Sequence, residues 1–302
     1  MRVAVTGGTG LIGRAFAADL AKDGHEIIVL SRDPKRASGL PRGVRIERWD
    51  ALTADGWGSL ADGADAIVNL AGESIAAGRW TPERKRRIRE SRLNAGRAVV
   101  QAIEAATHRP GVVIQASGVG YYGPCGDEEV TEETPPGDDF LAQLAIEWEA
   151  SSARVQELGV RLVIIRTGIV LSAQGGALSR MMLPFPLLSA GRFGSGRQWF
   201  PWIHIADEVG AIRFLIENED AGGPFNLAAP NVVTNAEFSR HLGRELGRPV
   251  LVPMPAFALR LLLGQMATAV LDGQRAVPQR LVQMGFIFRF PEVDVALRDL
   301  LR

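Results

Sequence analysis

The sequence has a single cysteine and no excess of positive or negative charge. Cys125 is the only cysteine among 302 residues, so an intrachain disulfide is excluded and a reducing compartment is expected. Lys and Arg together number 34, as do Asp and Glu, and this balance offers no basic field to nucleic acid or an anionic membrane. Small molecules are therefore the expected partners, and nucleic acid is not.

The sequence also lacks a long, uninterrupted apolar run. Its best candidate for a membrane span, residues 257–271, is shorter than the roughly 20 residues required and contains Arg260 and Gln265. The N-terminus enters a strand pattern at once, without a basic leader and an apolar segment. We expect no membrane insertion, a cytoplasmic location, and a buried or interface helix at residues 257–271.

Short runs rich in Val, Ile and Leu alternate with helical patterns over the first 170 residues. Apolar runs include 2–6, 26–31, 66–71, 111–117 and 160–170, and helical patterns cover 11–23, 82–106 and 138–158. This alternation predicts a parallel sheet with helices on both faces, in a doubly wound α/β fold whose ligands bind at the carboxyl ends of the strands. The pattern loosens later, so we expect a main domain at 1–170 and a smaller lobe at 171–302, although "GPFNLAA" can return a strand to the sheet.

The stretch "RVAVTGGTGLIG" (residues 2–13) has glycines at a spacing that suits a sharp turn from a strand into a helix. Gly7, Gly10 and Gly13 permit a tight turn and let backbone N–H groups approach a diphosphate, to which the helix adds its positive N-terminal end. A strand before the turn, an amphipathic helix after it and a second strand at 26–31 give the motif its context. The stretch predicts a dinucleotide-binding turn.

The end of the second predicted strand selects the nucleotide. An acidic residue there would bind the 2′-hydroxyl of the adenosine ribose and repel a 2′-phosphate. The sequence instead has Ser31 and Arg32, a hydroxyl and a guanidinium that suit a phosphate dianion. This favours NADP over NAD, with a solvated Arg32 and Asp33 in the acidic role as the alternative.

These segments resemble the extended short-chain dehydrogenases/reductases, and more closely their atypical epimerase family branch. The resemblance runs nearly end to end through "TGGTGLIG", "LSRD", "NLAGE", "RWTPERKRRIRESRLNAG", "GVGYYG", "FGSGRQWFPWIHIADE", "GPFNLAAP" and "RLVQMGFIFRFPEVDVALRDLL". It implies a Rossmann-like doubly wound fold with a smaller C-terminal lobe, which includes a module of unassigned role at about 250–302. The NADP contacts that it implies are Gly7, Gly10, Leu11, Ile12, Gly13, Ser31, Arg32, Leu70, Ala71 and Arg92.

Arg92 has two interpretations that the sequence leaves open. In "SRLNAG" it falls where related enzymes place an asparagine that lines the cofactor. It also belongs to a basic run with Arg84, Lys85 and Arg89, and such runs are commonly solvated faces of a helix.

The tyrosine and lysine that related enzymes use for proton transfer are missing. Those enzymes place the lysine four residues after the tyrosine, where it lowers the pKa of the phenol and holds the nicotinamide ribose. Here the only tyrosines are Tyr121 and Tyr122, and no lysine follows Lys85. The resemblance leaves Tyr122 and Ser117 as candidate catalytic hydroxyls, but a phenol without a cationic neighbour is a poor base at pH 7. Packing at a strand–loop junction is the competing interpretation for Tyr122.

Other polar residues suggest structural roles more than chemistry. Glu73 follows a strand and is a candidate acid/base or turn cap, whereas Glu147 and Glu149 are expected at the surface or in capping. His204 and Asp207 are expected to order a lid, with Asp207 as a helix N-cap. The remaining histidines have no metal-ligand spacing, so no metal site is predicted.

Together these features predict an NADP(H)-binding oxidoreductase or epimerase for a small carbonyl or nucleotide-sugar-like substrate. Residues 192–202, which include Arg192, Trp199 and Trp202, suit either an anionic or planar substrate or the core of the lobe. The missing tyrosine–lysine pair motivates an alternative hypothesis, a non-catalytic NADPH sensor whose C-terminal lobe binds a protein partner. From the resemblance alone, we expect a homodimer through the helices at 82–106 and 138–158.

Overall fold

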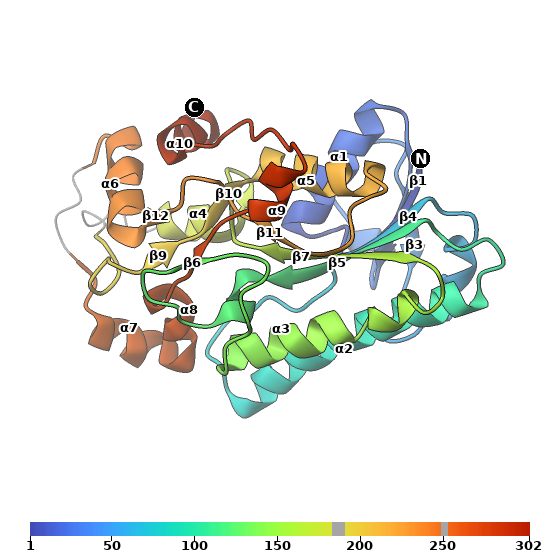
Figure 1. Ribbon diagram of the computed structural model, residues 1–302, viewed down its shortest axis with the longest axis horizontal. Coiled ribbons are helices and arrows are strands. Elements are labelled where there is room, and N and C mark those ends of the chain that lie inside the picture. The colour runs from blue at the N-terminus through green and yellow to red at the C-terminus, as the bar shows by residue number, and fades with distance from the viewer. Residues whose placement is uncertain (183–190, 249–252) are drawn as a thin grey trace.

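The structure, a computed structural model, describes residues 1–182, 191–248 and 253–302. Its centre is a seven-stranded parallel sheet in the order β11-β7-β5-β4-β1-β2-β3 (Figure 1). The strands are β1 (Arg2–Thr6), β2 (Glu26–Ser31), β3 (Arg45–Arg48), β4 (Ala66–Asn69), β5 (Val112–Gly118), β7 (Arg161–Thr167) and β11 (Gly223–Leu227). The order reverses between β1 and β4, where a sheet of this type binds its ligand. This topology confirms the predicted doubly wound α/β fold.

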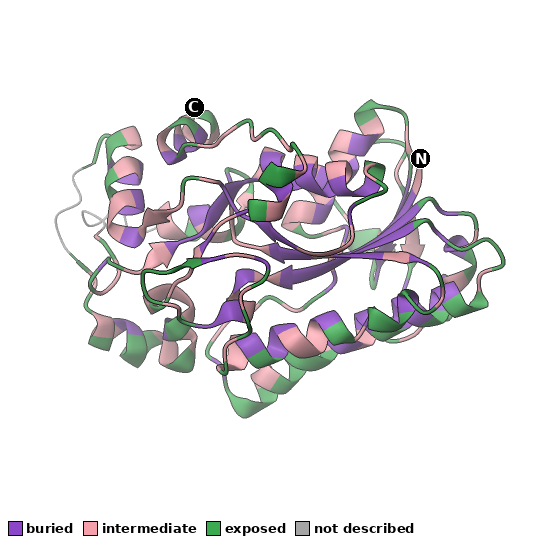
Figure 2. Cartoon of the chain, viewed as in Figure 1, coloured by how far each residue is buried: buried purple, intermediate pink, exposed green. Residues whose placement is uncertain are grey.

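Helices cover both faces of the sheet. The α-helices of the described residues are α1 (Leu11–Lys22), α2 (Pro82–Ala105), α3 (Phe140–Ala150), α4 (Gly176–Met182), α5 (Ile205–Glu217), α6 (Asn235–Glu245), α7 (Ala256–Leu263), α8 (Thr268–Leu271), α9 (Gln279–Gln283) and α10 (Val293–Leu301). Helices α1 and α5 lie on one face, and α2 and α3 lie on the other (Figure 1). Strands β1, β2, β4, β5 and β7 are largely buried, which explains their nearly continuous apolar sequences, whereas the edge strand β3 is polar and partly exposed (Figure 2).

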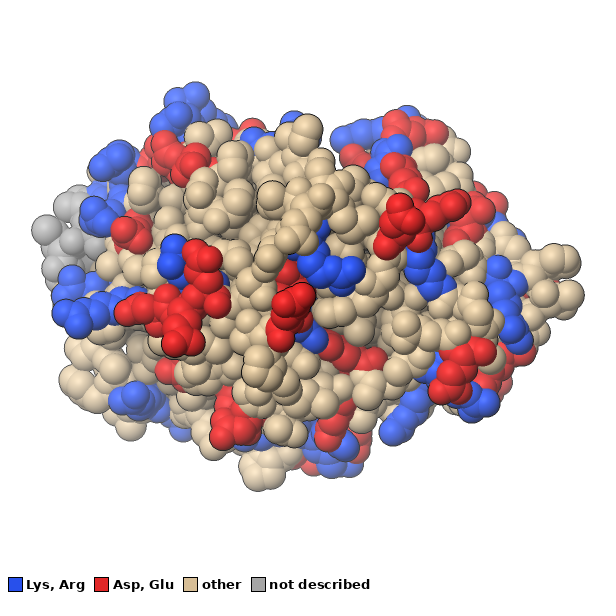
Figure 3. Space-filling model, in the orientation of Figure 1, with Lys and Arg blue, Asp and Glu red and all other residues tan. Residues whose placement is uncertain are grey.

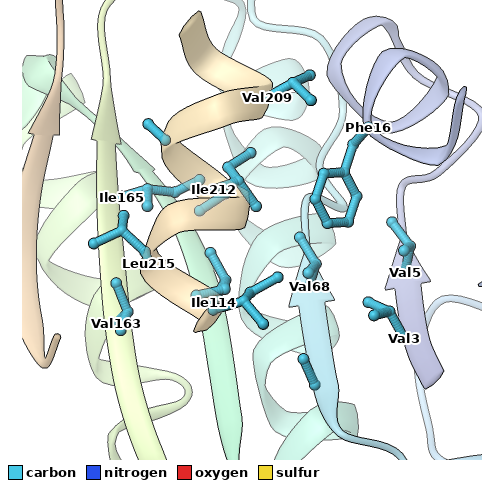
Figure 4. Packing of buried hydrophobic residues seen from close by; sticks show 14 of the residues in the cluster. Val3, Val5, Phe16, Val68, Ile114, Val163, Ile165, Val209, Ile212 and Leu215 are labelled. Atoms are coloured by element: carbon cyan, nitrogen blue, oxygen red, sulfur yellow. The ribbon is translucent and has the colours of Figure 1, made fainter. Parts of the chain in front are cut away.

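The core between the sheet and helices α1 and α5 is built from every second residue of the strands. Phe16 of α1 and Ile212 of α5 pack over Val5, Val68 and neighbouring side chains of the sheet (Figure 4). Successive residues of a strand point to opposite faces of the sheet. Ala4 and Ile67, which precede Val5 and Val68 in their strands, therefore belong to the core on the α2 side. On the face of the molecule that Figure 3 shows, acidic and basic side chains are interspersed, in keeping with the balanced composition.

Two predicted elements are shorter than the sequence pattern indicated. The helix expected at 138–158 ends at Ala150, where the hydroxyl of Ser151 turns back to the carbonyl oxygen of Trp148 at 2.6 Å. The strand expected at 160–170 is interrupted at Gly168, where a Cβ would lie 2.5 Å from the carbonyl oxygen of Pro201. The chain leaves the main sheet at that glycine.

Short strand pairs and small helices build the rest of the chain. The short strands are β6 (Glu129–Val130), β8 (Ile169–Ser172), β9 (Trp199–Phe200), β10 (Trp202–His204), β12 (Val233–Thr234) and β13 (Arg275–Ala276). They pair as β8 with β10, β9 with β12 and β6 with β13, while β11 returns to the edge of the main sheet beside β7. Residues 183–190 and 249–252 of the predicted lobe lie outside the described residues.

The apolar stretch at 257–271 is not one buried helix. It is divided between α7 and α8 at Gly264, which has a φ of +62°, and Phe257 and Leu261 are largely exposed. In the part of the chain that the structure describes, no helix combines the length and apolarity needed to cross a bilayer. The division at Gly264 and the exposed side chains show that one buried helix was the wrong interpretation of this stretch, and its role at an interface stays a prediction.

Candidate functional site

The turn between β1 and α1 brings backbone segments into close contact. Gly7 has a φ of +67°, and a Cβ there would lie 2.6 Å from the carbonyl group of Leu70. A Cβ at Gly13 would lie 2.5 Å from the Cα of Gly8. Gly10 precedes α1 without any side-chain cap, so the free N–H groups of the first helical turn are open to a ligand. The turn is a cradle of backbone amides of the kind that binds a diphosphate.

A buried polar chain lies across the central strands below this cradle. Thr6 of β1 donates to the side chain of Asn69 in β4, which in turn donates to Gln115 of β5 at 2.8 Å. All three side chains are fully buried and satisfy one another, so they fix the central strands where the strand order reverses. Asn69 and Gln115 were not sequence predictions. The available signal was a polar residue inside an otherwise apolar strand.

Ser31 and Arg32 lie at the carboxyl end of β2. Ser31 is buried, and its Oγ accepts the N–H of Asp33 at 3.2 Å. Arg32 is exposed, and it makes no ion pair or side-chain hydrogen bond with any residue that the structure describes. Its guanidinium is therefore available to a ligand phosphate beside the Ser31 hydroxyl.

Arg92 is buried in α2, which excludes the solvated-charge interpretation. Its Nη1 donates to the backbone carbonyl oxygens of Glu73 and Ile88, both at 3.0 Å, and its guanidinium lies 4.7 Å over the ring of Trp148. Among the described residues no carboxylate pairs with this guanidinium, and its Nε has no partner. Burial accordingly lowers the pKa of Arg92 to about 10. A Cβ at Gly72 would lie 3.1 Å from the guanidinium carbon, which places this cation close to the segment that borders the cradle.

Ser117, in β5, belongs to a buried ion-pair network. Its hydroxyl donates to Glu149 of α3 at 2.7 Å, and Glu149 accepts two hydrogen bonds of 2.9 Å from Arg166 of β7. The predicted surface or capping role of Glu149 was wrong, because the fold turns its carboxylate inward onto Arg166. Glu147 does lie at the surface, where it pairs with Arg89. The network ties α3 to β5 and β7.

Tyr122 extends this network from the short 3₁₀ turn at Val119–Tyr122. Its hydroxyl donates to Oδ1 of Asn226 at 2.7 Å and accepts a hydrogen bond from Arg166 at 3.2 Å. Burial raises the pKa of Tyr122 to about 12, even though Arg166 opposes the shift. The fold thus supplies a cationic neighbour that the sequence did not show, and the phenol is still neutral at pH 7. The catalytic roles of Tyr122 and Ser117 stay predictions.

His204 and Asp207 attach the C-terminal segment to the start of α5. His204 is the N-cap of α5, and its Nδ1 accepts the N–H of Ala206 at 3.0 Å. Asp207 accepts the backbone N–H groups of Arg289 and Phe290 at 2.8 and 2.9 Å. The predicted N-cap role of Asp207 was wrong, because its carboxylate binds these two amides while His204 caps the helix.

The remaining candidates also have partners within the fold. The Glu73 carboxylate pairs with Arg84 and Arg87 at 3.2 and 2.9 Å. Trp202 is fully buried, which supports a core role for this part of residues 192–202. Within residues 1–182, 191–248 and 253–302, no three His, Cys, Asp or Glu side chains are grouped so that they could hold a metal ion.

Comparisons with known proteins agree with this arrangement. The NAD dependent epimerase/dehydratase family matches residues 3–228, and a domain of unknown function, DUF1731, matches residues 254–300. The human epimerase family protein SDR39U1 is 40% identical over 304 residues, covering 99% of each chain. The epimerase family protein YfhF of Bacillus subtilis is 36% identical over 311 residues, covering 100% of this chain and 98% of the relative.

A solved structure extends the likeness to three dimensions. The crystal structure of human SDR39U1 (isoform 2) with NADPH has a TM-score of 0.91 and 37% identity, covering 100% of this chain and 99% of that one. The nucleotide in that structure agrees with the predicted class of cofactor. Because the family match spans residues 3–228 and the relatives align from end to end, the resemblance is confirmed: the chain belongs to the NAD-dependent epimerase/dehydratase family.

Proposed function

We propose that this chain binds NADP(H) and acts as an oxidoreductase or epimerase on a small carbonyl or nucleotide-sugar-like substrate. The observation that carries the proposal is the backbone cradle, where Gly7 and Gly13 leave no room for a Cβ, together with Arg32 just after the neighbouring strand β2, whose guanidinium has no partner among the described residues. The NADPH-bound structure of human SDR39U1 supports the choice of nucleotide.

The residues present fit such a dinucleotide. The amides of residues 11–13 and the backbone of residues 70–71 would hold the diphosphate, because both segments border the cradle. Arg92 would neutralise a phosphate charge, since its buried guanidinium forms no direct ion pair with a carboxylate of the described residues, although Glu73 lies close enough to oppose the lowering of its pKa by burial. Ser31 and Arg32 would bind the 2′-phosphate at the other end of the molecule.

The bound nicotinamide would supply the hydride chemistry, and the chain would orient it and manage the proton. Tyr122, with a pKa of about 12, can donate a proton at pH 7 but cannot serve as a base. To donate to a substrate it must release Asn226. Ser117 must similarly release Glu149. Either residue would therefore act through an exchange of hydrogen-bond partners.

A non-catalytic NADPH sensor is the second candidate function. The observation that favours it is the self-satisfied network of Ser117, Glu149, Arg166, Tyr122 and Asn226, which uses the two candidate hydroxyls for internal hydrogen bonds. In this version, the nucleotide would regulate the binding of a protein partner by the C-terminal lobe.

Calorimetric titration with NADPH and NADH tests the binding step. Arg32→Ala should weaken NADPH binding by about 1–3 kcal/mol and leave NADH binding nearly unchanged, because only NADPH carries the 2′-phosphate. Arg42→Ala, which removes an exposed arginine of the loop that precedes β3, is the matched control and should change neither affinity. Equal losses for both nucleotides in Arg32→Ala would contradict the assigned role.

A screen of carbonyl compounds and nucleotide sugars, followed by nicotinamide absorbance, separates the enzyme from the sensor. Turnover that is lost in Tyr122→Phe or Ser117→Ala, with NADPH affinity retained, would support the enzyme. Tight binding without turnover of any substrate would favour the sensor. Sedimentation velocity tests whether the chain forms the homodimer that the resemblance predicts.

A further inference from the structure

The loop between β4 and α2, residues 70–81, starts at the cradle and is held in place largely by arginine side chains. Its first residues lie against Gly7, and near its end Trp80 is buried with its ring 5.1 Å from that of Phe140. Between these two anchors the residues are mostly exposed or half-buried. Three carbonyl oxygens of this part of the loop accept arginine hydrogen bonds: Glu73 from Arg92, Ser74 from Arg84 and Ala76 from Arg180.

Two arginine contacts connect this loop to parts of the chain that are distant in sequence. Nη1 of Arg180 in α4 donates to the carbonyl oxygen of Ala76 at 2.6 Å. Arg79, in the loop itself, donates from Nε to the carbonyl oxygen of Leu262 at 2.9 Å and from Nη2 to that of Leu261. The two leucines lie in the last turn of α7, inside the C-terminal domain of unknown function. The loop is thus hydrogen-bonded to α4 through Arg180 and to the C-terminal domain through Arg79.

Helix α4 also approaches the cradle. A Cβ at Gly176, the first residue of α4, would lie 2.8 Å from Cδ2 of Leu11, the first residue of α1. The hydrogen bond from Arg180 to Ala76 therefore joins a helix that contacts the start of α1 to a loop that starts against Gly7. These segments lie around the part of the chain assigned to the diphosphate.

We propose that the β4–α2 loop is a strap over the bound dinucleotide, and that the C-terminal domain controls its opening through Arg79. This inference rests on the proposed function, because the strap has a role only if the nucleotide binds in the cradle. In this arrangement the C-terminal domain sets the rates at which NADP(H) enters and leaves.

The contacts at Arg79 and Arg180 suit a segment that opens without unfolding the protein. They are exposed hydrogen bonds from side chain to backbone, and the middle of the loop adds little buried apolar surface. Individually weak bonds of this kind break far more readily than the packed core opens. Loss of either contact should raise the population of the open loop.

Stopped-flow binding of NADPH, followed by its fluorescence, tests the strap in the full chain. Arg180→Ala and Arg79→Ala should each raise the association and dissociation rates together by about tenfold, with Kd changed by less than about threefold. Arg154→Ala breaks an exposed ion pair with Glu104 and is the matched control, with wild-type rates expected. Hydrogen exchange of the amides at 73–78 should be faster in both strap variants.

The possible failures are distinguishable. Wild-type rates in both variants, with normal NADPH affinity, would overturn the strap and leave the proposed function intact. Faster dissociation with proportionally weaker binding would mean that the arginine contacts the nucleotide directly, which also overturns the strap. Changed rates in Arg180→Ala alone would overturn control by the C-terminal domain. Absence of NADPH binding by the unmodified protein would overturn both proposals.

Discussion

Replacing the buried carboxyl of Glu208 should make the protein less sensitive to rising pH. Glu208, in α5, is fully buried; its Oε1 accepts the hydroxyl of Thr167 at 2.9 Å, and its Oε2 has no partner among the described residues. Burial raises the pKa of Glu208 from 4.5 to about 8. The folded protein therefore holds a proton there at pH 7 that the unfolded chain has released.

The sign and size of the effect follow from this difference. Below pH 4.5 the group is protonated in both states, and its neutral form is compatible with burial. As the pH rises from 4.5 to 8, only the unfolded chain ionises, so folding stability is lost until the folded carboxyl also titrates. At about 1.4 kcal/mol for each pKa unit, the loss between pH 5 and pH 8 amounts to about 3 kcal/mol.

Denaturant unfolding of the wild type and Glu208→Gln at pH 5, 6, 7 and 8 measures this loss. Between pH 5 and pH 8 the wild type should lose about 3 kcal/mol of its free energy of unfolding relative to the variant. The variant does not show this loss because glutamine does not ionise. Glu219→Gln removes an exposed carboxylate just after the same helix and should show no such shift. A difference for Glu208→Gln that is constant with pH would show that the carboxyl is already ionised in the folded protein, which would refute the reasoning.

Three further predictions concern the cradle, the polar network and the C-terminal attachment. Gly13→Ala should abolish NADPH binding in calorimetry, because its Cβ would lie 2.5 Å from neighbouring backbone; retained affinity would contradict the cradle. Tyr122→Phe should lower the free energy of unfolding by about 1–2 kcal/mol, because Asn226 loses its donor, and unchanged denaturant unfolding would speak against the network. Asp207→Ala should speed tryptic cleavage at Arg289, detected by mass spectrometry, and equal protection would show that the Asp207 bonds do not hold this segment.

Local sequence determined much of the fold. The apolar runs and the helical patterns between them specified buried parallel strands with helices on both faces, because each pattern reflects which side of an element meets the core. The glycine spacing at 7, 10 and 13 specified the sharp turn, and the structure shows that Gly7 and Gly13 have no space for a side chain, whereas a Cβ at Gly10 would make one tight contact of 3.1 Å. The sequence did not show where two elements end. The strand before Gly168 ends where this glycine packs against Pro201, and the helix before Ser151 ends where the serine hydroxyl bonds to the carbonyl oxygen of Trp148.

What only the tertiary structure decided is the environment of the polar side chains. The sequence left Arg92 open between a solvated charge of a basic run and a cofactor contact, but the packing of α2 against α3 buries it under Trp148 with no direct ion pair among the described residues. It presented Tyr122 as a phenol without a cation, but the parallel strands bring Arg166 and Asn226, the latter 104 residues away, to its hydroxyl. Charge, burial and hydrogen-bond capacity depend on neighbours in space. Backbone conformation depends mainly on neighbours along the chain, so the sequence by itself determined the turn and the sheet, and the assembled fold determined the chemistry around them.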